Sequence, residues 1–377
     1  MTHDTTQIAP SRINAWLADH SNPSGAELAE AGYVVPHWPA PWGLGAEPSE
    51  QLEIDEALRR AGVRRPINPI GIGWAGPTIL AAGTEEQKQR WLPRLLSGED
   101  FWCQLFSEPG AGSDLSALST RAIRDGDEWV VSGQKVWTSY AHVARFGILL
   151  ARTDLEAERH HGISYFVCPM NLPGIEIRPL VDMTGDHAFN EVFLDEVRIP
   201  ADCLIGEAND GWRLAKVTLA NERVSLSGEG LLWGMGPTFD DLLGEIRASG
   251  RLVDPVMRDR VVRLWVRAEV IRALKLRLVA AAVTGRTPGP EASVRKALAD
   301  DLGQAAMNLA VDRAGAEGML EQAPGTPERV WSHGFLYSPA LTVGGGTSVV
   351  QRNIIAERVL GLPRDLEASP QTVASTT

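Results

Sequence analysis

The chain has 377 residues, 44% of them hydrophobic, which is enough for one large domain or for two to three domains packed together. Its net charge of −12 argues against general binding to nucleic acid or to anionic membranes, and it favours a small-molecule partner. The cysteines Cys103, Cys168 and Cys203 form no CxxC pair, so neither a disulfide framework nor a metal site is predicted. Such thiols suit a reduced, cytoplasmic setting. Residues 1–10 lack the apolar core of a signal peptide, and no run of about 18 apolar residues occurs, so no membrane segment is expected.

Residues 11–98 are predicted to be mostly helical. One helix should begin at Arg12 after Ser11 and another should cover residues 50–61, with a loop rich in proline, tryptophan and glycine at residues 35–48. Thr84 and Gln87 have the spacing of a capping box, so a short helix through Trp91 is predicted.

The segment 71–76 matches the pattern GxGxxG, which is typical of dinucleotide sites. That fingerprint requires a strand before it and a long helix after it, whereas Pro66 and Pro69 precede this segment and Pro77 follows it at once. We therefore reject a dinucleotide site and interpret the glycines as a loop or as positions of tight helix packing.

Residues 101–205 have the pattern of short strands. Asp125-Gly126-Asp127 indicates a hairpin, and further apolar or alternating runs follow at residues 146–151, 163–167, 175–180 and 191–199. With no helical pattern between them, these runs predict an antiparallel β-domain, either a small barrel or a sandwich.

Helical periodicity returns after Gly206, over residues 214–232, 257–283 and 291–314. The second of these segments should face the core through Val261, Leu264, Trp265, Ala268, Ile271, Leu274 and Leu278. It also carries Arg258, Arg260, Arg263, Arg267, Arg272, Lys275 and Arg277, which form either a solvated face or a contact for nucleotide phosphate. A final helix should follow the glycines at 344–346 and end near Gly361. The glycines are compatible with an anion site but not with a P-loop, because no lysine follows them. Residues 365–377 are predicted to be disordered.

The segment 105–114, together with residues 135–139, combines the features that a flat, phosphorylated cofactor needs. Gly110 and Gly112 allow close approach of the backbone, Ser107 and Ser113 supply hydroxyls, and Trp137 supplies an aromatic face. The alternative is a glycine-rich surface turn, with Trp137 in the core.

The order of helices, β-domain and helices, with four motifs in sequence, resembles the acyl-CoA dehydrogenase family of flavoproteins. The motifs are GTEEQK at 83–88, SEPGAGSD at 107–114, KVWTS at 135–139, and GGTS at 345–348 followed by QR at 351–352. The resemblance covers nearly the whole chain and implies an α+β fold that is mainly α. An N-terminal helical domain is expected over residues 1–100, an antiparallel β-domain over 101–205 and a C-terminal four-helix bundle over 206–364.

The resemblance also implies that FAD is the cofactor. The implied flavin-binding residues are Leu105, Phe106, Ser107, Gly112, Ser113, Trp137, Thr138, Ser139 and Thr347. Trp137 would stack against the isoalloxazine, Thr347 would lie at the adenine-diphosphate side, and Ser139 stands where the family usually has a threonine bonding flavin N5. Ser113, Arg223 and Gly345 are implied to contact the acyl-CoA substrate.

The reaction implied is α,β-dehydrogenation of an acyl-CoA thioester. A carboxylate removes the Cα proton while hydride leaves Cβ for flavin N5, and a flavin ribityl hydroxyl and a backbone amide stabilise the charge on the thioester oxygen. Many members carry the base where this chain has Gly345, whereas long-chain and isovaleryl-type members place it before an arginine, as in Glu222-Arg223. Glu222 is therefore the expected base, with a pKa raised by burial. Glu108 and Glu229 are other acids in reach, and Glu222 could instead be a helix-face carboxylate paired with a basic side chain.

Three departures from the family concern groups that members lend to a neighbouring subunit. Residues 236–259 contain Arg247 and Arg251 but no Arg-x-x-Phe-Gly segment for the neighbour's flavin pyrophosphate. The usual Gly-Gly-x-Gly-Tyr is reduced to GAEGM at 315–319, and Val349 replaces an acid or amide. The departures resemble actinobacterial members of steroid catabolism, which often form α2β2 heterotetramers with fewer flavins than chains.

Two hypotheses follow. In the first, the chain is a catalytic subunit that oxidises a bulky, branched or steroid-derived acyl-CoA, within a homo- or hetero-oligomeric dimer of dimers that uses an electron-transfer flavoprotein-like acceptor. In the second, it is a non-catalytic or half-site subunit of a heterotetramer. An oxidase or nitroalkane-type flavoenzyme on the same fold is a third alternative.

Overall fold

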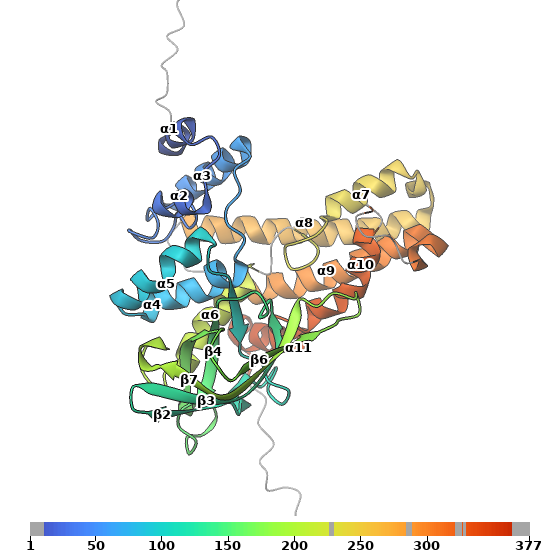
Figure 1. The fold of residues 1–377 in the computed structure, drawn as a ribbon. Coiled ribbons are helices and arrows are strands. Elements are labelled where there is room, and N and C mark those ends of the chain that lie inside the picture. The colour runs from blue at the N-terminus through green and yellow to red at the C-terminus, as the bar shows by residue number, and fades with distance from the viewer. Residues whose placement is uncertain (1–10, 226–229, 284–288, 321–325, 327–328, 364–377) are drawn as a thin grey trace, which may run out of the picture. The chain divides into compact units, whose positions relative to one another are not determined.

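The computed structural model describes residues 11–225, 230–283, 289–320, 326 and 329–363 (Figure 1). The chain divides into two units, the first made of Met1–Ser225 with Ala282–Gly285 and the second of Leu226–Ala281 with Arg286–Thr377. The segments 226–229 and 365–377, which include Glu229 and the expected disordered tail, lie outside the described residues.

The first unit begins with a group of short helices. They are α1 (Arg12–Asp19), α2 (Gly25–Glu30), α3 (Pro48–Ala61), α4 (Gly76–Ala82) and α5 (Glu85–Ser97). The predicted capping box forms, since the Thr84 hydroxyl accepts a hydrogen bond from the Gln87 amide and the Gln87 side chain accepts one from the Thr84 amide. Helix α5 continues six residues past Trp91 and contains Pro93, because Leu92, Leu95 and Leu96 are buried on its inner face.

The GxGxxG segment is a site of tight helix packing, which is one of the two alternatives predicted, and not a loop. Residues Gly71–Ala75 form a π-helical turn that leads directly into α4. A Cβ atom on Gly76 would lie 2.6 Å from the indole of Trp38, so only glycine allows this approach.

The sheet of the first unit has the strand order β6-β7-β3-β2-β4-β5-β8, with β1 also paired to β4. The strands are β1 (Trp102–Leu105), β2 (Arg121–Asp125), β3 (Glu128–Ser139), β4 (Phe146–Arg152), β5 (Ile163–Pro169), β6 (Ile175–Leu180), β7 (Phe189–Pro200) and β8 (Leu204–Ile205). Most pairs are antiparallel, as expected, but β1 and β2 each run parallel to β4. Every residue from 147 to 151 in β4 is buried, which shows that both faces of this central strand are covered.

Helix α6 (Gly211–Ser225) completes the first unit and packs on β5 and α4. The helix predicted over residues 214–232 is present as far as Ser225; residues 226–229 lie outside the described residues, and residues 230–232 are not helical. The described residues that follow form a tight turn, with bridges between Gly230 and Gly234 and between Leu232 and Met235. Gly234 and Gly236 in this turn have φ values of 77° and 71°, in the left-handed region that favours glycine.

The second unit is helical. It contains α7 (Phe239–Ala248), most of α8 (Pro255–Val283), α9 (Glu291–Ala314), α10 (Arg329–Tyr337) and α11 (Ser348–Ile354), around a core that includes Leu242, Val261, Leu264, Ala306 and Met307. The periodicity of residues 257–283 predicted α8, but Trp265 is 44% exposed rather than in the core, and the side chain of Leu278 lies outside the described residues.

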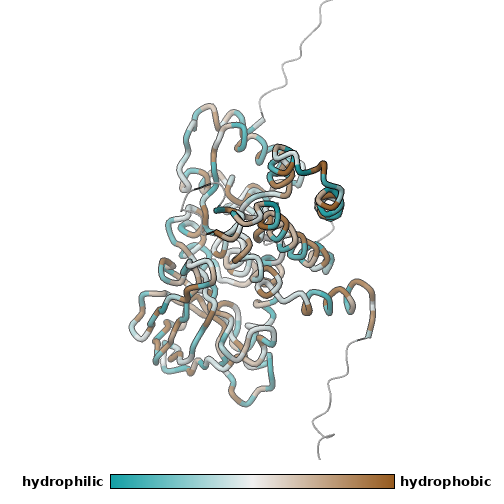
Figure 2. Tube along the Cα trace, turned by 90° about the vertical axis from the view of Figure 1, so that its right-hand side faces the viewer, coloured by the Kyte–Doolittle hydropathy of each residue, from teal (hydrophilic) through white to brown (hydrophobic). Residues whose placement is uncertain are grey.

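Most of the basic residues of α8 are exposed to solvent, and ion pairs are formed by Arg260, Arg263 and Arg272. Arg260 pairs with Asp312 at 2.5 Å and Arg263 with Asp259 at 2.8 Å, all four side chains being more than two-fifths exposed. Within the described part of the chain, no helix is long and apolar enough to cross a membrane. Figure 2 shows hydrophilic and hydrophobic residues interleaved along the trace.

Candidate functional site

The glycine-rich segment forms an exposed loop directly after β1. Glu108 and Ala111 exchange backbone hydrogen bonds of 3.1 and 3.0 Å, which places Pro109 and Gly110 at the tip of a tight turn. A Cβ atom added to Gly110 or Gly112 would meet nothing within 4 Å. The packing of this chain therefore does not require glycine at either position, and the open side of the loop has room for a ligand.

A buried ion pair fixes this loop to the sheet. The Lys135 ammonium on β3 lies 2.8 Å from the Glu108 carboxylate and also donates to the Phe106 carbonyl at 3.0 Å, and both charged side chains are almost inaccessible to solvent. Glu108 additionally accepts hydrogen bonds from the amides of Ser119 and Thr120 and from the Ser119 hydroxyl. A charged pair is stable in such surroundings because its remaining lone pairs are satisfied.

Trp137 faces solvent rather than the core. Its side chain is 61% exposed, its φ is 58°, and it lies within an irregularity in the pairing of β3 with β7. The Phe189 ring meets it edge-on at 5.9 Å. A large indole held in this way in a left-handed conformation offers a stacking face to a planar ligand, which excludes the alternative of a core tryptophan.

The residues next to Trp137 divide between two faces of the strand. Thr138 is completely buried, and its carbonyl accepts a hydrogen bond from the Asn190 side-chain amide. Ser139 is half-buried and Ser113 is exposed. Leu105 and Phe106 are buried at the base of the loop, where Phe106 packs edge-on against Tyr165. An exposed indole, open glycine positions and two accessible hydroxyls fit a flavin ring better than they fit a simple surface turn.

Glu222 is a buried carboxylate on α6, with only 6% of its surface exposed. Its helix approaches β5 closely, because a Cβ atom on Gly211 would lie 2.5 Å from the Ser164 backbone. One turn before Glu222, the Thr218 hydroxyl lies 2.8 Å from the Thr78 hydroxyl on α4 and 3.0 Å from the Tyr165 hydroxyl on β5. This completely buried hydroxyl network therefore fixes the position of α6 within the first unit.

Glu108, the alternative base, is a buried carboxylate that is already ion-paired with Lys135. Burial by itself raises the pKa of Glu108, but the charge of Lys135 and the hydrogen bonds from Lys135, Thr120 and Ser119 more than offset this effect and lower it to about 2. A carboxylate held ionised by these donors is a poor proton acceptor. Glu229, the other alternative base, and the side chain of Arg223, an expected substrate contact, lie outside the described residues.

Gly345 and Thr347 belong to the second unit, in the loop before α11. The Thr347 hydroxyl accepts a hydrogen bond from the Val350 amide, so it caps this helix. Gly345 has a φ of 65°, in the left-handed region. The carbonyl groups of this loop are held by Lys296 and Gln351, of which sequence reasoning had not singled out Lys296.

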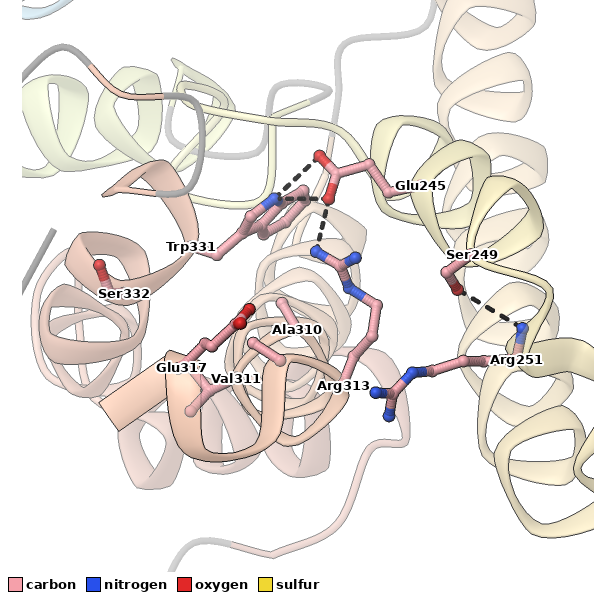
Figure 3. Close-up of a pocket in the computed structure, with 11 residues that line it drawn as sticks. Glu245, Ser249, Arg251, Ala310, Val311, Arg313, Glu317, Trp331 and Ser332 are labelled. Carbon is pink, nitrogen blue, oxygen red and sulfur yellow. Dashed lines mark hydrogen bonds and ion pairs between the residues drawn. The ribbon is translucent and has the colours of Figure 1, made fainter. Parts of the chain in front are cut away.

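The two segments that depart most from the family pattern line one cavity of the second unit (Figure 3). Its volume is about 570 Å³, and its lining includes Arg251 from the first segment and Glu317 and Gly318 from the second. On its wall the Glu245 carboxylate accepts hydrogen bonds from Arg313 at 2.6 Å and from the Trp331 indole at 2.9 Å. The lining of the cavity thus includes the arginines Arg251 and Arg313, and Arg313 is already paired with the Glu245 carboxylate.

Comparisons with known proteins give the same family from end to end. The models for the N-terminal, middle and C-terminal domains of acyl-CoA dehydrogenases match residues 5–99, 103–197 and 209–360. The chain is 46% identical to acyl-CoA dehydrogenase FadE34 of Mycobacterium tuberculosis over 89% of this chain, although it spans only 46% of FadE34.

Two solved structures share the fold over most of their length. The Tcur3481-Tcur3483 steroid ACAD superposes with a TM-score of 0.77 at 30% identity, covering 93% of this chain and 95% of that one. The ChsE4-ChsE5 complex from Mycobacterium tuberculosis gives 0.76 at 32% identity, covering 90% and 89%. The chain therefore belongs to the acyl-CoA dehydrogenase family, whose members are flavin-dependent oxidoreductases acting on CH–CH bonds.

Proposed function

We propose that the chain catalyses FAD-dependent α,β-dehydrogenation of an acyl-CoA thioester, with Glu222 as the base. The observation that carries this proposal is a carboxylate buried on α6, whose helix is tied through Thr218 to the same β-domain that presents Trp137. Burial suits a base that must work beside an apolar acyl chain, and a rigid helix suits the positioning that proton transfer requires.

Each part of the chain then has a chemical task. Trp137 stacks on the flavin, the loop at 107–114 and Ser139 line it, and Thr347 contributes on the adenine-diphosphate side. FAD, when bound, supplies a hydride acceptor for the hydrogen at Cβ. Glu222 removes the proton at Cα. We assign to Gly345 the backbone amide that donates to the thioester oxygen, where negative charge develops as that proton leaves.

A steroid-derived or similarly bulky acyl group is the substrate class we propose, on the strength of the likeness to the steroid ACAD. The test is to mix FAD-loaded protein anaerobically with acyl-CoA thioesters carrying a steroid side chain and with linear ones of equal carbon number. We expect flavin bleaching and a product lighter by two hydrogens with the steroid thioester. Bleaching by the linear thioester alone would contradict the substrate assignment, and rapid reoxidation of the reduced flavin by oxygen would favour an oxidase.

A half-site role within a heteromer is the second candidate. It is supported by the cavity in which Arg251 lies beside the Glu245–Arg313 pair, since a carboxylate there opposes binding of a neighbour's flavin pyrophosphate. The relevant measurement is the number of flavins per chain, for this protein alone and with a co-encoded partner. One flavin per two chains in the complex would support this role, and one flavin per chain in a homo-oligomer would exclude it. An electron-transfer flavoprotein-like protein is the proposed electron acceptor.

A further inference from the structure

The loop that carries Gly345 has an unusual need for external support. Gly344, Gly345 and Gly346 follow the 3-10 helix η7 (Ser338–Thr342), and Gly345 and Gly346 have φ values of 65° and 86°. Consecutive glycines lose more conformational entropy on ordering than any other residues, so their own backbone preferences do not define one conformation. Some other part of the protein must select the direction of each peptide group.

Lys296 on α9 supplies that support. Its side chain is completely buried, and its ammonium donates to the carbonyls of Leu341, Gly344 and Gly346 at 3.0, 2.8 and 3.0 Å. The Asp300 carboxylate, one turn along α9, lies 2.6 Å from the same nitrogen. Taking an ammonium out of water costs several kcal/mol unless it is fully paired, and here carbonyls and a carboxylate surround it.

Gln351 on α11 holds the same loop from its other end. Its side-chain amide donates to the carbonyls of Gly345 and Gly346 at 3.0 and 3.2 Å, and its side chain is also completely buried. The carbonyls of all three glycines are therefore turned toward two buried side chains, Lys296 and Gln351.

The orientation of these carbonyls determines the orientation of the amides. In a trans peptide the C=O of one residue and the N–H of the next lie in one plane and point in opposite directions. Because Lys296 binds the Gly344 carbonyl, the Gly345 N–H points away from Lys296 and toward the opposite face of the loop.

We infer that Lys296 is a positioning residue, which aims the Gly345 amide at the thioester oxygen of the substrate. This inference rests on the proposed function, in which that amide stabilises charge developing on the oxygen. Gln351 supports the same loop by holding the Gly345 and Gly346 carbonyls, but it does not bind the Gly344 carbonyl. Lys296 itself touches neither substrate nor flavin; it acts only through the backbone.

The test compares Lys296→Met with Lys296→Arg and with a matched control, Gln304→Leu. Gln304 lies on the same helix and donates to the Ser338 carbonyl at 3.1 Å and the Thr342 hydroxyl at 3.2 Å, in the adjoining η7 rather than in the glycine loop. The probe is acetoacetyl-CoA, because its acidic α-proton is lost more easily when the thioester oxygen accepts a strong hydrogen bond.

For Lys296→Met we expect the pH midpoint of enolate formation by bound acetoacetyl-CoA to rise by about one to two units, and flavin reduction by substrate to slow about 30- to 300-fold. The dissociation constant of acyl-CoA should change less than about fivefold. Lys296→Arg should recover part of the loss, and Gln304→Leu should resemble the wild type. A folded Lys296→Met protein with a wild-type midpoint and reduction rate would overturn the inference.

Two further measurements keep the outcome decisive. If Lys296→Met does not fold, Gln351→Leu takes its place, with a smaller rise of the midpoint expected and an unchanged midpoint counting against the inference. If even the wild type fails to ionise acetoacetyl-CoA, the proposed function is wrong. The role of Lys296 in positioning the loop is then tested by amide hydrogen exchange in FAD-free protein. We expect the amides of residues 344–347 to exchange faster in Lys296→Arg than in Gln304→Leu, and equal rates would refute a positioning role for Lys296.

Discussion

The buried pair of Glu108 and Lys135 gives the sharpest prediction about stability. Replacing Glu108 by Gln leaves the Lys135 ammonium in an inaccessible site with the Phe106 carbonyl as its main remaining acceptor. Removing one partner of a buried ion pair costs about 3–5 kcal/mol. Lys135→Met should cost less, about 1–3 kcal/mol, because Glu108 keeps its bonds from Ser119 and Thr120.

The two substitutions should not be additive. In the Lys135→Met background Glu108 no longer compensates a buried ammonium, so replacing Glu108 there should cost less free energy of unfolding. The double variant should therefore be more stable, by about 2 kcal/mol, than the sum of the two single effects would give. Equilibrium urea unfolding, followed by tryptophan fluorescence and circular dichroism together, measures all four proteins.

A pair on the same strand serves as the control for this cycle. Glu128, at the other end of β3, lies 3.0 Å from Arg198, and both side chains are about half exposed. Exposed pairs couple by about 0.2–1 kcal/mol. A coupling between Glu108 and Lys135 no larger than that of the Glu128–Arg198 pair would refute the view that this buried pair anchors the loop.

Three other predictions concern the same unit. Because the pKa of Glu108 is lowered to about 2 from 4.5, the stability it contributes is fully present above about pH 4.5 and is lost as pH falls toward 2. Over this window the free energy of unfolding of Glu108→Gln should fall by about 3 kcal/mol less than that of the wild type. Parallel curves of unfolding free energy against pH would contradict the assignment. Thr218→Val should lower the free energy of unfolding by about 1–3 kcal/mol, because it removes the buried hydrogen bond between the Thr218 and Tyr165 hydroxyls, whereas Thr218→Ser should restore most of the loss; a Val variant as stable as the Ser variant would argue against the network. Trp137→Ala should weaken FAD binding, measured by titration of FAD-free protein, while unfolding changes by less than about 0.5 kcal/mol, since the indole is exposed; unchanged FAD affinity would remove Trp137 from the flavin site.

The sequence correctly predicted the helices, strands and turns that depend on patterns within a few neighbouring residues. The run at residues 175–180 is β6 to the residue, the hairpin turn falls at Gly126-Asp127, and residues 291–314 form α9. Alternation and turn chemistry act over a few residues, so the sequence displays them directly. The end of α6 was missed because the apolar spacing of Leu231 and Leu232 resembles a helix, whereas these residues pack into the core of the second unit.

The polar groups that hold the candidate site could not be predicted in the same way. Lys135 stands in a strand where a solvated side chain is the default interpretation, and its partner Glu108 lies 27 residues earlier. Lys296 and the glycine carbonyls that it binds are 48 and 50 residues apart, and the Thr78–Thr218 contact spans 140. Such pairs are created by tertiary packing, and a single sequence carries no periodic signal for them. Trp137 was singled out as an aromatic face beside the glycine-rich segment, whereas the role predicted for Glu222 came only from the family resemblance.

The base assignment is the central claim, and one variant tests it directly. FAD-loaded Glu222→Gln is mixed anaerobically with the steroid acyl-CoA, beside the wild type and a Glu229→Gln control. We predict that Glu222→Gln keeps its FAD and binds the thioester, while bleaching of the flavin slows by about 10²- to 10⁴-fold and Glu229→Gln bleaches normally. Bleaching of Glu222→Gln at the wild-type rate would contradict the account.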